Sequence, residues 1–480
     1  MTDTEILTIA FHVPTGLEDY ALSSILHQLG EHISAQIKTA APLHSSHVLI
    51  RFPSNALLTQ AIQIYATGAL WAVYEAFICV AEVSLDDVHP VLGEEFWERE
   101  REMGRKAREN QRENALRKRL ARAHKEQTQE PKEAEEGEPL HAERPTPTAG
   151  ELLLLSSLHK LVTSHSSQLQ ESISLLHPPP SFRATFSNPS RLLPLSTLRR
   201  RDIERHLGDT LSLFLPIDQW SVNLTNPGVD VHVRLLPLGP KWTSHTLPPF
   251  LPAPELTQPP LKSQHFPPSL WALLALSFPP PPTPAHRLPP LQGPTSLSPP
   301  IAHLLALVYI SLFPNSVVVL DPCAGTCSIP RELAALAKER KHPIFVLGGD
   351  ISLSALADPC QCIEKIQYTA LESLPLRFVD GFITDLPWGT RHLSPRQVKV
   401  FYPKLMLHLA EVMRAEGRGG GGGGRGRGRG CGCGGRGGGG VLMSAARGGL
   451  DRALHGWEKE GVREVRVGGR VVWVWGVRKV

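Results

Sequence analysis

The chain has 480 residues, 41% of them hydrophobic, which is enough for about two to four domains with buried cores. Lys and Arg outnumber Asp and Glu by 50 to 46, and this surplus is too small to indicate or exclude a nucleic-acid partner. No apolar run approaches about 20 residues, and no basic segment precedes an apolar one near residue 1, so the sequence predicts neither a membrane span nor secretion. Seven dispersed cysteines fit a reducing compartment, and we expect a cytoplasmic location, with the nucleus as the alternative.

The first 93 residues alternate between strand-like and helix-like patterns. An apolar run at 6–13 predicts a strand, and apolar residues at helical spacing from Leu17 to Leu29 predict a helix after it. The pattern repeats with a strand at 47–52, a helix from Leu57 to Ala66 and more strand-like sequence at 70–83. We therefore expect a small α+β domain over 1–93.

The next two segments differ sharply in composition. Residues 94–150 mix Glu, Arg and Lys with few large apolar residues, which predicts an exposed charged helix that fades into a linker. Residues 151–240 predict a second α/β unit: a helix at 151–176, a strand at 182–186, a helix at 196–215 and a strand pair at 220–236 joined by a turn. Arginines crowd the second helix, namely Arg199, Arg200 and Arg201. They suit phosphate contacts, although they could equally form a plain polar face.

Two low-complexity segments follow. Residues 241–292 are so rich in proline that we expect a linker, crossed by one strand within 269–277. Residues 416–440 consist mainly of Gly and Arg, a composition typical of RNA-contacting segments, and we expect an enlarged loop inside a C-terminal domain over 293–480. The CxC pairs at 360/362 and 431/433 do not have the spacing of structural zinc ligands, so we expect no metal.

Two acidic residues in the C-terminal domain follow predicted strands directly. Residues 316–320 predict a buried strand, and Asp321 begins a turn of small residues that leads into a helix. Such a turn lets the backbone approach a bound cofactor closely. The next predicted strand ends at Asp350, where a carboxylate can accept both ribose hydroxyls of an adenosine-containing cofactor.

A third strand ends in the sequence Asp385-Leu386-Pro387-Trp388, which has the form of an Asp/Asn-Pro-Pro-aromatic motif. The exocyclic amine of a nucleobase is a poor nucleophile because its lone pair is delocalised into the ring. A carboxylate and a backbone carbonyl that accept its two N–H bonds can draw the nitrogen towards tetrahedral geometry. An aromatic side chain beside them can stack on the base. The motif therefore predicts an amine-methylating site.

These motifs together resemble the THUMP-domain tRNA guanine-N2 methyltransferases. The DLPWG sequence at 385–389 combined with the GPTSL sequence at 293–297 is the specific part of the resemblance, and the DPCAGTC turn at 321–327 resembles the family's first cofactor motif. The resemblance covers most of the chain. It implies an α/β fold in which a C-terminal Rossmann-like class I methyltransferase domain is preceded by an α+β N-terminal ferredoxin-like domain and a THUMP domain. The terminal sequence at 462–480 resembles the strand pair that closes the family's sheet.

The family's activity is the S-adenosylmethionine-dependent methylation of the guanosine N2 amine in tRNA, and the resemblance implies matching site residues here. Cofactor-binding residues are Thr295, Ser296, Asp321, Pro322, Ala324, Gly325, Thr326, Asp350 and Ile351. Catalytic residues are Asp385, Leu386, Pro387 and Trp388. Residues for RNA contact are Arg287 and Arg391, together with the three arginines at 199–201. The resemblance further implies that the two front domains hold the 3′ end and acceptor stem of tRNA, and that a small zinc-containing activator subunit is a partner.

The sequence departs from the family pattern at two positions. Cys327 stands where the family has a second glycine, so this position can demand an unusual backbone angle from a residue with a side chain. No acid occupies the usual adenine-contacting position, which leaves Glu372 as a displaced candidate. Two alternatives therefore stay open: the same chemistry on another small structured RNA, and an RNA-binding homologue with impaired catalysis.

Overall fold

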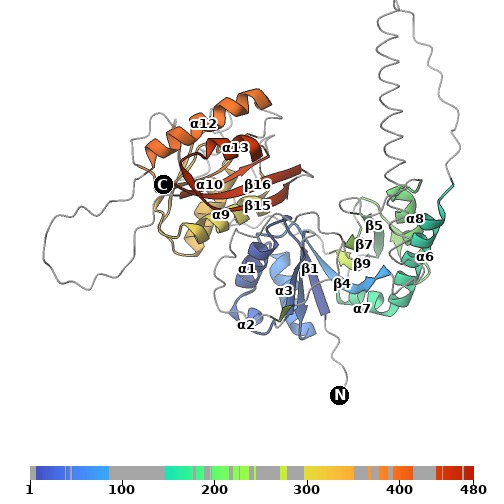
Figure 1. Ribbon diagram of the computed structural model, residues 1–480. Helices are drawn as coiled ribbons and strands as arrows, with labels where there is room; N and C mark the ends of the chain where they lie inside the picture. Colours follow the sequence, from blue (N-terminus) through green and yellow to red (C-terminus); the bar gives the residue numbers. More distant parts are fainter. Residues whose placement is uncertain are drawn as a thin grey trace, which may run out of the picture.

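The computed structural model contains two β-sheets, each covered by helices (Figure 1). It describes residues 7–37, 39–43, 46–85, 146–176, 180–188, 195, 197–215, 220–225, 227–236, 243–244, 271–277, 297–350, 366–368, 378–387, 393–413, 439–445, 447–467 and 470–479. Among these, no helix is both long enough and apolar enough to cross a bilayer. The charged segment at 94–145 and the Gly/Arg-rich segment at 416–438 lie outside the described residues.

A nine-stranded sheet contains the described strands before residue 278, and we call it with its helices the front sheet unit. Its strand order is β6-β5-β7-β9-β4-β1-β3-β2-β8. The strands are β1 (Leu7–His12), β2 (Thr39–Leu43), β3 (His47–Phe52), β4 (Glu75–Ser84), β5 (Ser181–Ser187), β6 (Ser221–Val222), β7 (Val229–Leu236), β8 (Thr243–Ser244) and β9 (Trp271–Ser277). The helices are α1 (Glu18–Leu29), α2 (Glu31–Ser34), α3 (Asn55–Ala66), α6 (Ala149–Ser164), α7 (Ser166–Leu176) and α8 (Arg200–Leu211).

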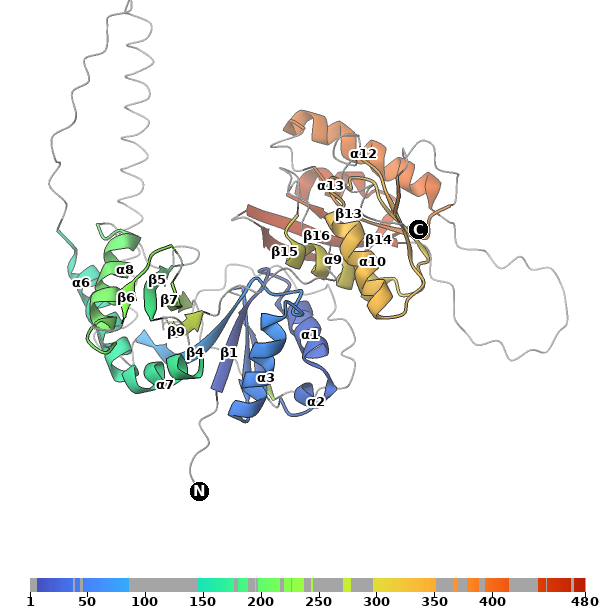
Figure 2. The same cartoon turned by 180° about the vertical axis from the view of Figure 1, so that it is seen from behind.

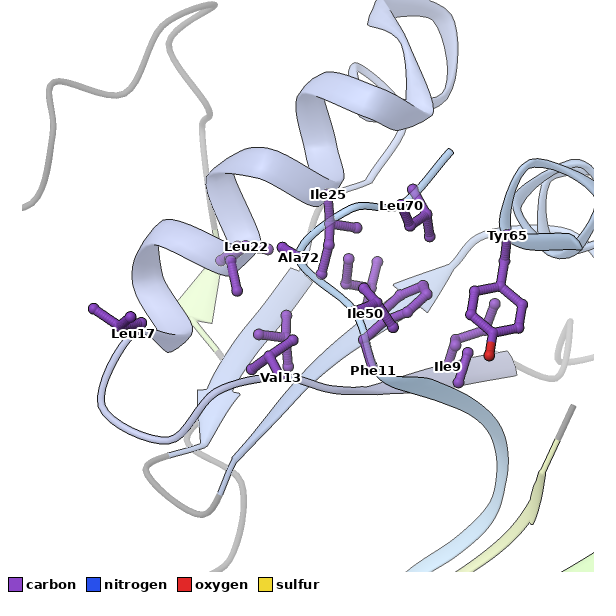
Figure 3. Close-up of a cluster of buried hydrophobic side chains, with 14 of the residues drawn as sticks. Ile9, Phe11, Val13, Leu17, Leu22, Ile25, Ile50, Tyr65, Leu70 and Ala72 are labelled. Atoms are coloured by element: carbon purple, nitrogen blue, oxygen red, sulfur yellow. The ribbon is translucent and has the colours of Figure 1, made fainter. Parts of the chain in front are cut away.

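One apolar face of this sheet packs against the helices because strand side chains alternate between the two faces. In the N-terminal half, Ile9, Phe11 and Ile50 pack against Ile25 of α1 and Tyr65 of α3 (Figure 3). All five side chains are at most 2% exposed. Burial of these apolar side chains in one core stabilises the strands and helices that the sequence predicts for the first 85 residues.

Strand β9 joins the two halves of the sheet. It pairs antiparallel with β4 on one side and with β7 on the other, so the strands before residue 85 and those after residue 180 form one continuous sheet. The long strand β4 visibly spans from the N-terminal half into the second half (Figures 1 and 2). The strand expected within the proline-rich segment is therefore present. The domain boundaries expected from the sequence stay a prediction.

The helical stretch expected at 151–176 is present as two helices, α6 and α7, which are separated at His165. One expectation for the second half was wrong. The strands expected as a joined pair at 220–236 do not pair with each other, because β6 and β7 lie on opposite sides of β5 and run parallel to it. The turn residues between β6 and β7 therefore did not determine which strand each of them pairs with.

The C-terminal unit is a three-layer structure around a seven-stranded sheet with the order β12-β11-β10-β13-β14-β16-β15. The strands are β10 (Val318–Asp321), β11 (Phe345–Gly348), β12 (Ile366–Tyr368), β13 (Gly381–Asp385), β14 (Gly439–Ser444), β15 (Trp457–Val467) and β16 (Arg470–Lys479), and the helices are α9 (Pro299–Leu312), α10 (Ser328–Glu339), α12 (Pro395–Val412) and α13 (Arg447–Ala453). The strands from β10 to β14 are parallel, whereas β16 runs antiparallel to β14 and β15. Helices α9 and α10 pack on one face of the sheet, and α12 and α13 pack on the other. This is the predicted Rossmann-like fold, closed by the predicted terminal strand pair.

The N-terminal half docks against this C-terminal unit (Figure 2). The Arg463 guanidinium on β15 lies 3.3 Å from the Asp19 carboxylate, and the Arg466 backbone N–H donates to the Thr15 carbonyl at 3.1 Å. Gly16 has a φ of +91°, and a Cβ there would lie 2.0 Å from the Glu464 carbonyl oxygen. The two backbones therefore approach so closely that only glycine fits at residue 16.

Candidate functional site

The predicted site residues gather at one edge of the seven-stranded sheet. Asp321 is the last residue of β10 and Asp385 the last residue of β13, and these two parallel strands are neighbours. Asp350 follows the end of β11, the neighbour of β10 on the other side. The chain order of the strands reverses between β10 and β13, and ligands of open α/β sheets bind beyond the carboxyl ends of strands at such a reversal.

The turn after β10 is held against the end of β11 by backbone contacts. The Ala324 N–H donates to the Gly349 carbonyl at 2.8 Å, and the Gly349 N–H donates to the Asp321 carbonyl at 2.8 Å. The Gly325 N–H donates to the Asp350 carboxylate at 2.8 Å. One Asp350 oxygen therefore fixes the turn in addition to any contact with a ligand, a role that the sequence did not indicate.

Cys327 has a left-handed backbone conformation, which is the kind of unusual angle expected where the family has a glycine. Its φ is +59° and its ψ is +30°, at the residue that precedes α10. Gly325, two residues earlier, has a φ of +51°. The Cys327 side chain is fully buried and packs against Ala324. The turn thus keeps its left-handed shape without the second glycine, at a backbone cost of about 1–2 kcal/mol for a residue that carries a Cβ.

The Asp321 carboxyl has an unusual protonation equilibrium because it is only 1% exposed. Burial raises its pKa to about 7, and the negative charges of Asp385 and Asp350 raise it as well. The Thr384 hydroxyl and the Cys323 N–H, which donates to the carboxylate at 3.1 Å, act in the opposite direction. At the strand ends, the Asp321 carboxyl is therefore repelled by two other acids, and this favours a cationic ligand there.

The segment after β13 is anchored from two other elements. The Leu386 N–H donates to the Met443 carbonyl of β14 at 2.9 Å, and the Leu386 side chain is buried. The Pro387 carbonyl accepts a hydrogen bond from the Tyr402 hydroxyl of α12 at 2.8 Å. The Tyr402 hydroxyl also lies 2.5 Å from Ser444 Oγ at the end of β14. Sequence reasoning missed Tyr402 and Ser444, because neither lies in a recognisable motif.

The remaining predicted residues are placed as follows. Pro322 and Thr326 lie in the turn, partly exposed, with Thr326 Oγ1 3.3 Å from Ser328 Oγ. The three arginines at 199–201 lie in the front sheet unit at the start of α8, where the Arg200 guanidinium pairs with Glu204 at 2.7 Å. Outside the described residues lie Thr295, Ser296, Ile351, Trp388, Arg287, Arg391, Glu372 and the four CxC cysteines. The described part of the chain holds no group of three or more His, Cys, Asp or Glu residues arranged for a metal ion.

Comparisons with known proteins place the fold. No protein-family model and no curated protein sequence matches the chain. Among solved structures, TrmN from Thermus thermophilus aligns with a TM-score of 0.54 and 16% identity, covering 99% of this chain and 100% of TrmN. SMU.472, a methyltransferase candidate solved in complex with SAH, aligns with a TM-score of 0.50 and 10% identity over 99% of this chain and 98% of its own. A methylase candidate from Clostridium difficile 630 aligns with a TM-score of 0.51 and 10% identity over 99% of each chain. The chain therefore shares the fold of these proteins over its whole length, which confirms at the level of the fold the resemblance stated from the sequence.

Proposed function

We propose that this protein is an S-adenosylmethionine-dependent RNA methyltransferase that forms N2-methylguanosine in the acceptor-stem region of tRNA. The observation that carries the proposal is the convergence of Asp321, Asp350 and Asp385 at the strand-order reversal of a Rossmann-like sheet. Asp321 and Asp385 are the last residues of β10 and β13, and Asp350 lies two residues after β11. Three acids that follow three different strands would not be expected to meet at one sheet edge if each of them only stabilised a turn.

The electrostatics of this edge suit the proposed cofactor. S-adenosylmethionine carries a positive sulfonium and an ammonium group, and the three acids would be relieved of their mutual repulsion by such charges. The turn from Asp321 to Thr326 would hold the amino-acid end of the cofactor, and Asp350 the ribose. SMU.472, a protein with the same overall fold, was solved in complex with SAH, which supports a cofactor of this class.

The chain's own residues account for the reaction at the amine. Asp385 and the Pro387 carbonyl would accept the two N–H bonds of guanine N2 and so free its lone pair for the incoming methyl group. Trp388 would stack on the base. The nitrogen would gain the methyl group as the carbon–sulfur bond of the sulfonium breaks and S-adenosylhomocysteine leaves, and it would lose one proton to solvent or to Asp385.

The front sheet unit supports an RNA substrate. We assign its two halves to the ferredoxin-like domain (1–93) and the THUMP domain (151–240) of the resembled family, which would hold the 3′ end of tRNA. Arginines 199–201 at the start of α8 would contact phosphates. A small zinc-containing activator subunit would complete the enzyme, as the resemblance implies.

The decisive experiment replaces Asp385 by Ala and measures single-turnover transfer of labelled methyl to unmodified tRNA, with nucleoside analysis of the product. Loss of a preorganised polar group of this kind costs about a hundredfold to a thousandfold in rate, and we expect that loss with nearly unchanged tRNA and cofactor affinity. The matched control is Asp380→Ala. Its carboxylate precedes the same strand at the other end, where it accepts the Val317 and Val318 N–H groups at 2.9 and 2.7 Å. Asp380→Ala should lower stability and leave the methyl-transfer rate of the folded protein unchanged.

Full activity in Asp385→Ala, or a product methylated anywhere other than a guanine exocyclic amine, would contradict the mechanism. The two open alternatives have their own signatures. A catalytically impaired RNA-binding homologue would bind tRNA but show no cofactor binding by calorimetry. An enzyme for another RNA would be revealed by the modified nucleosides that disappear in a deletion strain.

A further inference from the structure

The segment that would grip the substrate amine is held in place by a tyrosine from a helix on one face of the sheet. Strand β13 ends at Asp385, and the Leu386 N–H makes the last backbone bond to the neighbouring strand β14. Pro387 has no N–H, so its carbonyl is the only backbone group by which this residue can be fixed through a hydrogen bond. The Tyr402 hydroxyl donates to that carbonyl at 2.8 Å.

The hydroxyl of Tyr402 is itself oriented by a second buried group. Its single proton is used on the Pro387 carbonyl, so the Ser444 hydroxyl must donate to the Tyr402 oxygen across the 2.5 Å contact. Ser444 is fully buried and Tyr402 is 1% exposed. Burial raises the pKa of Tyr402 to about 12, so the proton stays on the phenol at neutral pH. The three groups therefore form a directed chain from Ser444 through Tyr402 to Pro387.

The tyrosine ring and its hydroxyl have separable tasks. The ring packs with Leu405, Leu409 and Phe382 in the core between α12 and the sheet, a task that phenylalanine would perform equally well. Only the hydroxyl reaches the Pro387 carbonyl. A tyrosine at this position is therefore explained by the hydrogen bond rather than by packing.

We propose that Tyr402, oriented by Ser444, is a positioning residue for methyl transfer: it fixes the Pro387 carbonyl and thereby the placement of Asp385 against the substrate amine. The inference rests on the proposed function of the same site. Tyr402 does not itself touch substrate or cofactor. A carbonyl oxygen has two lone pairs, so Pro387 can hold the tyrosine proton and still accept an N–H from the base.

The test compares Tyr402→Phe with Tyr309→Phe in the full-length protein. Tyr309 also carries a fully buried hydroxyl, and that hydroxyl lies at the opposite end of the same strand, 2.1 Å from where a Cβ on Gly381 would be. Steady-state methyl transfer to unmodified tRNA gives kcat and KM, calorimetry gives cofactor affinity, and thermal unfolding gives stability. Tyr402→Phe should lower kcat about tenfold to a hundredfold, while KM for tRNA and cofactor affinity change less than about threefold. Tyr309→Phe should keep its kcat, whatever change in stability the unfolding measurement gives.

A second variant, Ser444→Ala, tests the chain without altering Tyr402. It should lower kcat in the same direction by a smaller factor, because the phenol keeps its bond to Pro387 but loses its orientation. An unchanged kcat in both Tyr402→Phe and Ser444→Ala would overturn this inference and leave the proposed function standing. An equal loss of kcat in Tyr309→Phe also overturns it, since the effect would then follow stability. A wild-type protein that transfers no methyl group to RNA overturns the proposed function and the inference together.

Discussion

The buried Asp321 carboxyl leads to a prediction about stability and pH. Its pKa lies at about 7 in the folded protein, against 3.8 for an ordinary aspartate. Because the folded-state pKa is raised, folding favours the protonated form of the carboxyl. Its contribution to stability is fully present below the unfolded pKa of 3.8 and is lost as the pH rises through 7. For these two pKa values, the free energy of unfolding should fall by about 2 to 3 kcal/mol between pH 5 and pH 8 on account of this group alone.

Asp321→Asn removes this dependence. An asparagine at this position can still accept the Cys323 N–H through its side-chain oxygen, and it carries no charge to be desolvated. We expect the pH 5 to pH 8 decrease to be about 2 to 3 kcal/mol smaller in the variant, because the titrating groups away from this strand edge act equally in both proteins. Urea unfolding followed by circular dichroism at the two pH values measures this difference. An identical pH dependence in both proteins would refute the electrostatic description of the strand ends.

Two further predictions concern the docking of the units and the RNA surface. Gly16→Ala should destabilise the protein by more than about 2 kcal/mol, because the added Cβ would lie 2.0 Å from the Glu464 carbonyl oxygen. Gly30→Ala is its control in thermal unfolding, since Gly30 has a similar φ of +82° but nothing within 4 Å of a Cβ; equal losses would argue against a tight docking contact. Arg201→Ala should weaken tRNA binding and lower the magnitude of the log-log salt slope by about 0.7 to 0.9. Filter binding between low and high salt checks this, and an unchanged slope would exclude Arg201 from the phosphate contacts.

The strand ends and the turn at the C-terminal candidate site could be predicted from the sequence because the information for them is local. A buried strand, an acid at its end and a small-residue turn are all contained in a few consecutive residues, as in the stretch from β10 to Cys327. Because β10, β11 and β13 are parallel, their carboxyl ends lie at one edge of the sheet, and Asp321, Asp350 and Asp385 come together there. Even the left-handed backbone at Cys327 could be anticipated, since a glycine was expected there.

Long-range contacts could not be predicted in the same way. Tyr402 looks like any other buried position on an amphipathic helix, and only the folded sheet brings its hydroxyl to Pro387. The partners of β6 and β7 depend on β5, which lies far away in the sequence. The docking of Gly16 on β15 likewise joins two ends of the chain that no local pattern connects.

The position of β9 also determines when the front of the protein can fold during synthesis. Strand β4 ends at Ser84, whereas its neighbour β9 begins only at Trp271. Until the ribosome has released that strand, both β4 and β7 present an open edge along which other chains could pair. Contacts between residues so distant in sequence form slowly, so the nascent chain passes through a long interval of exposure before the sheet is complete. Substitutions that weaken β9 should therefore reduce the yield of folded protein more than the activity of the molecules that do fold.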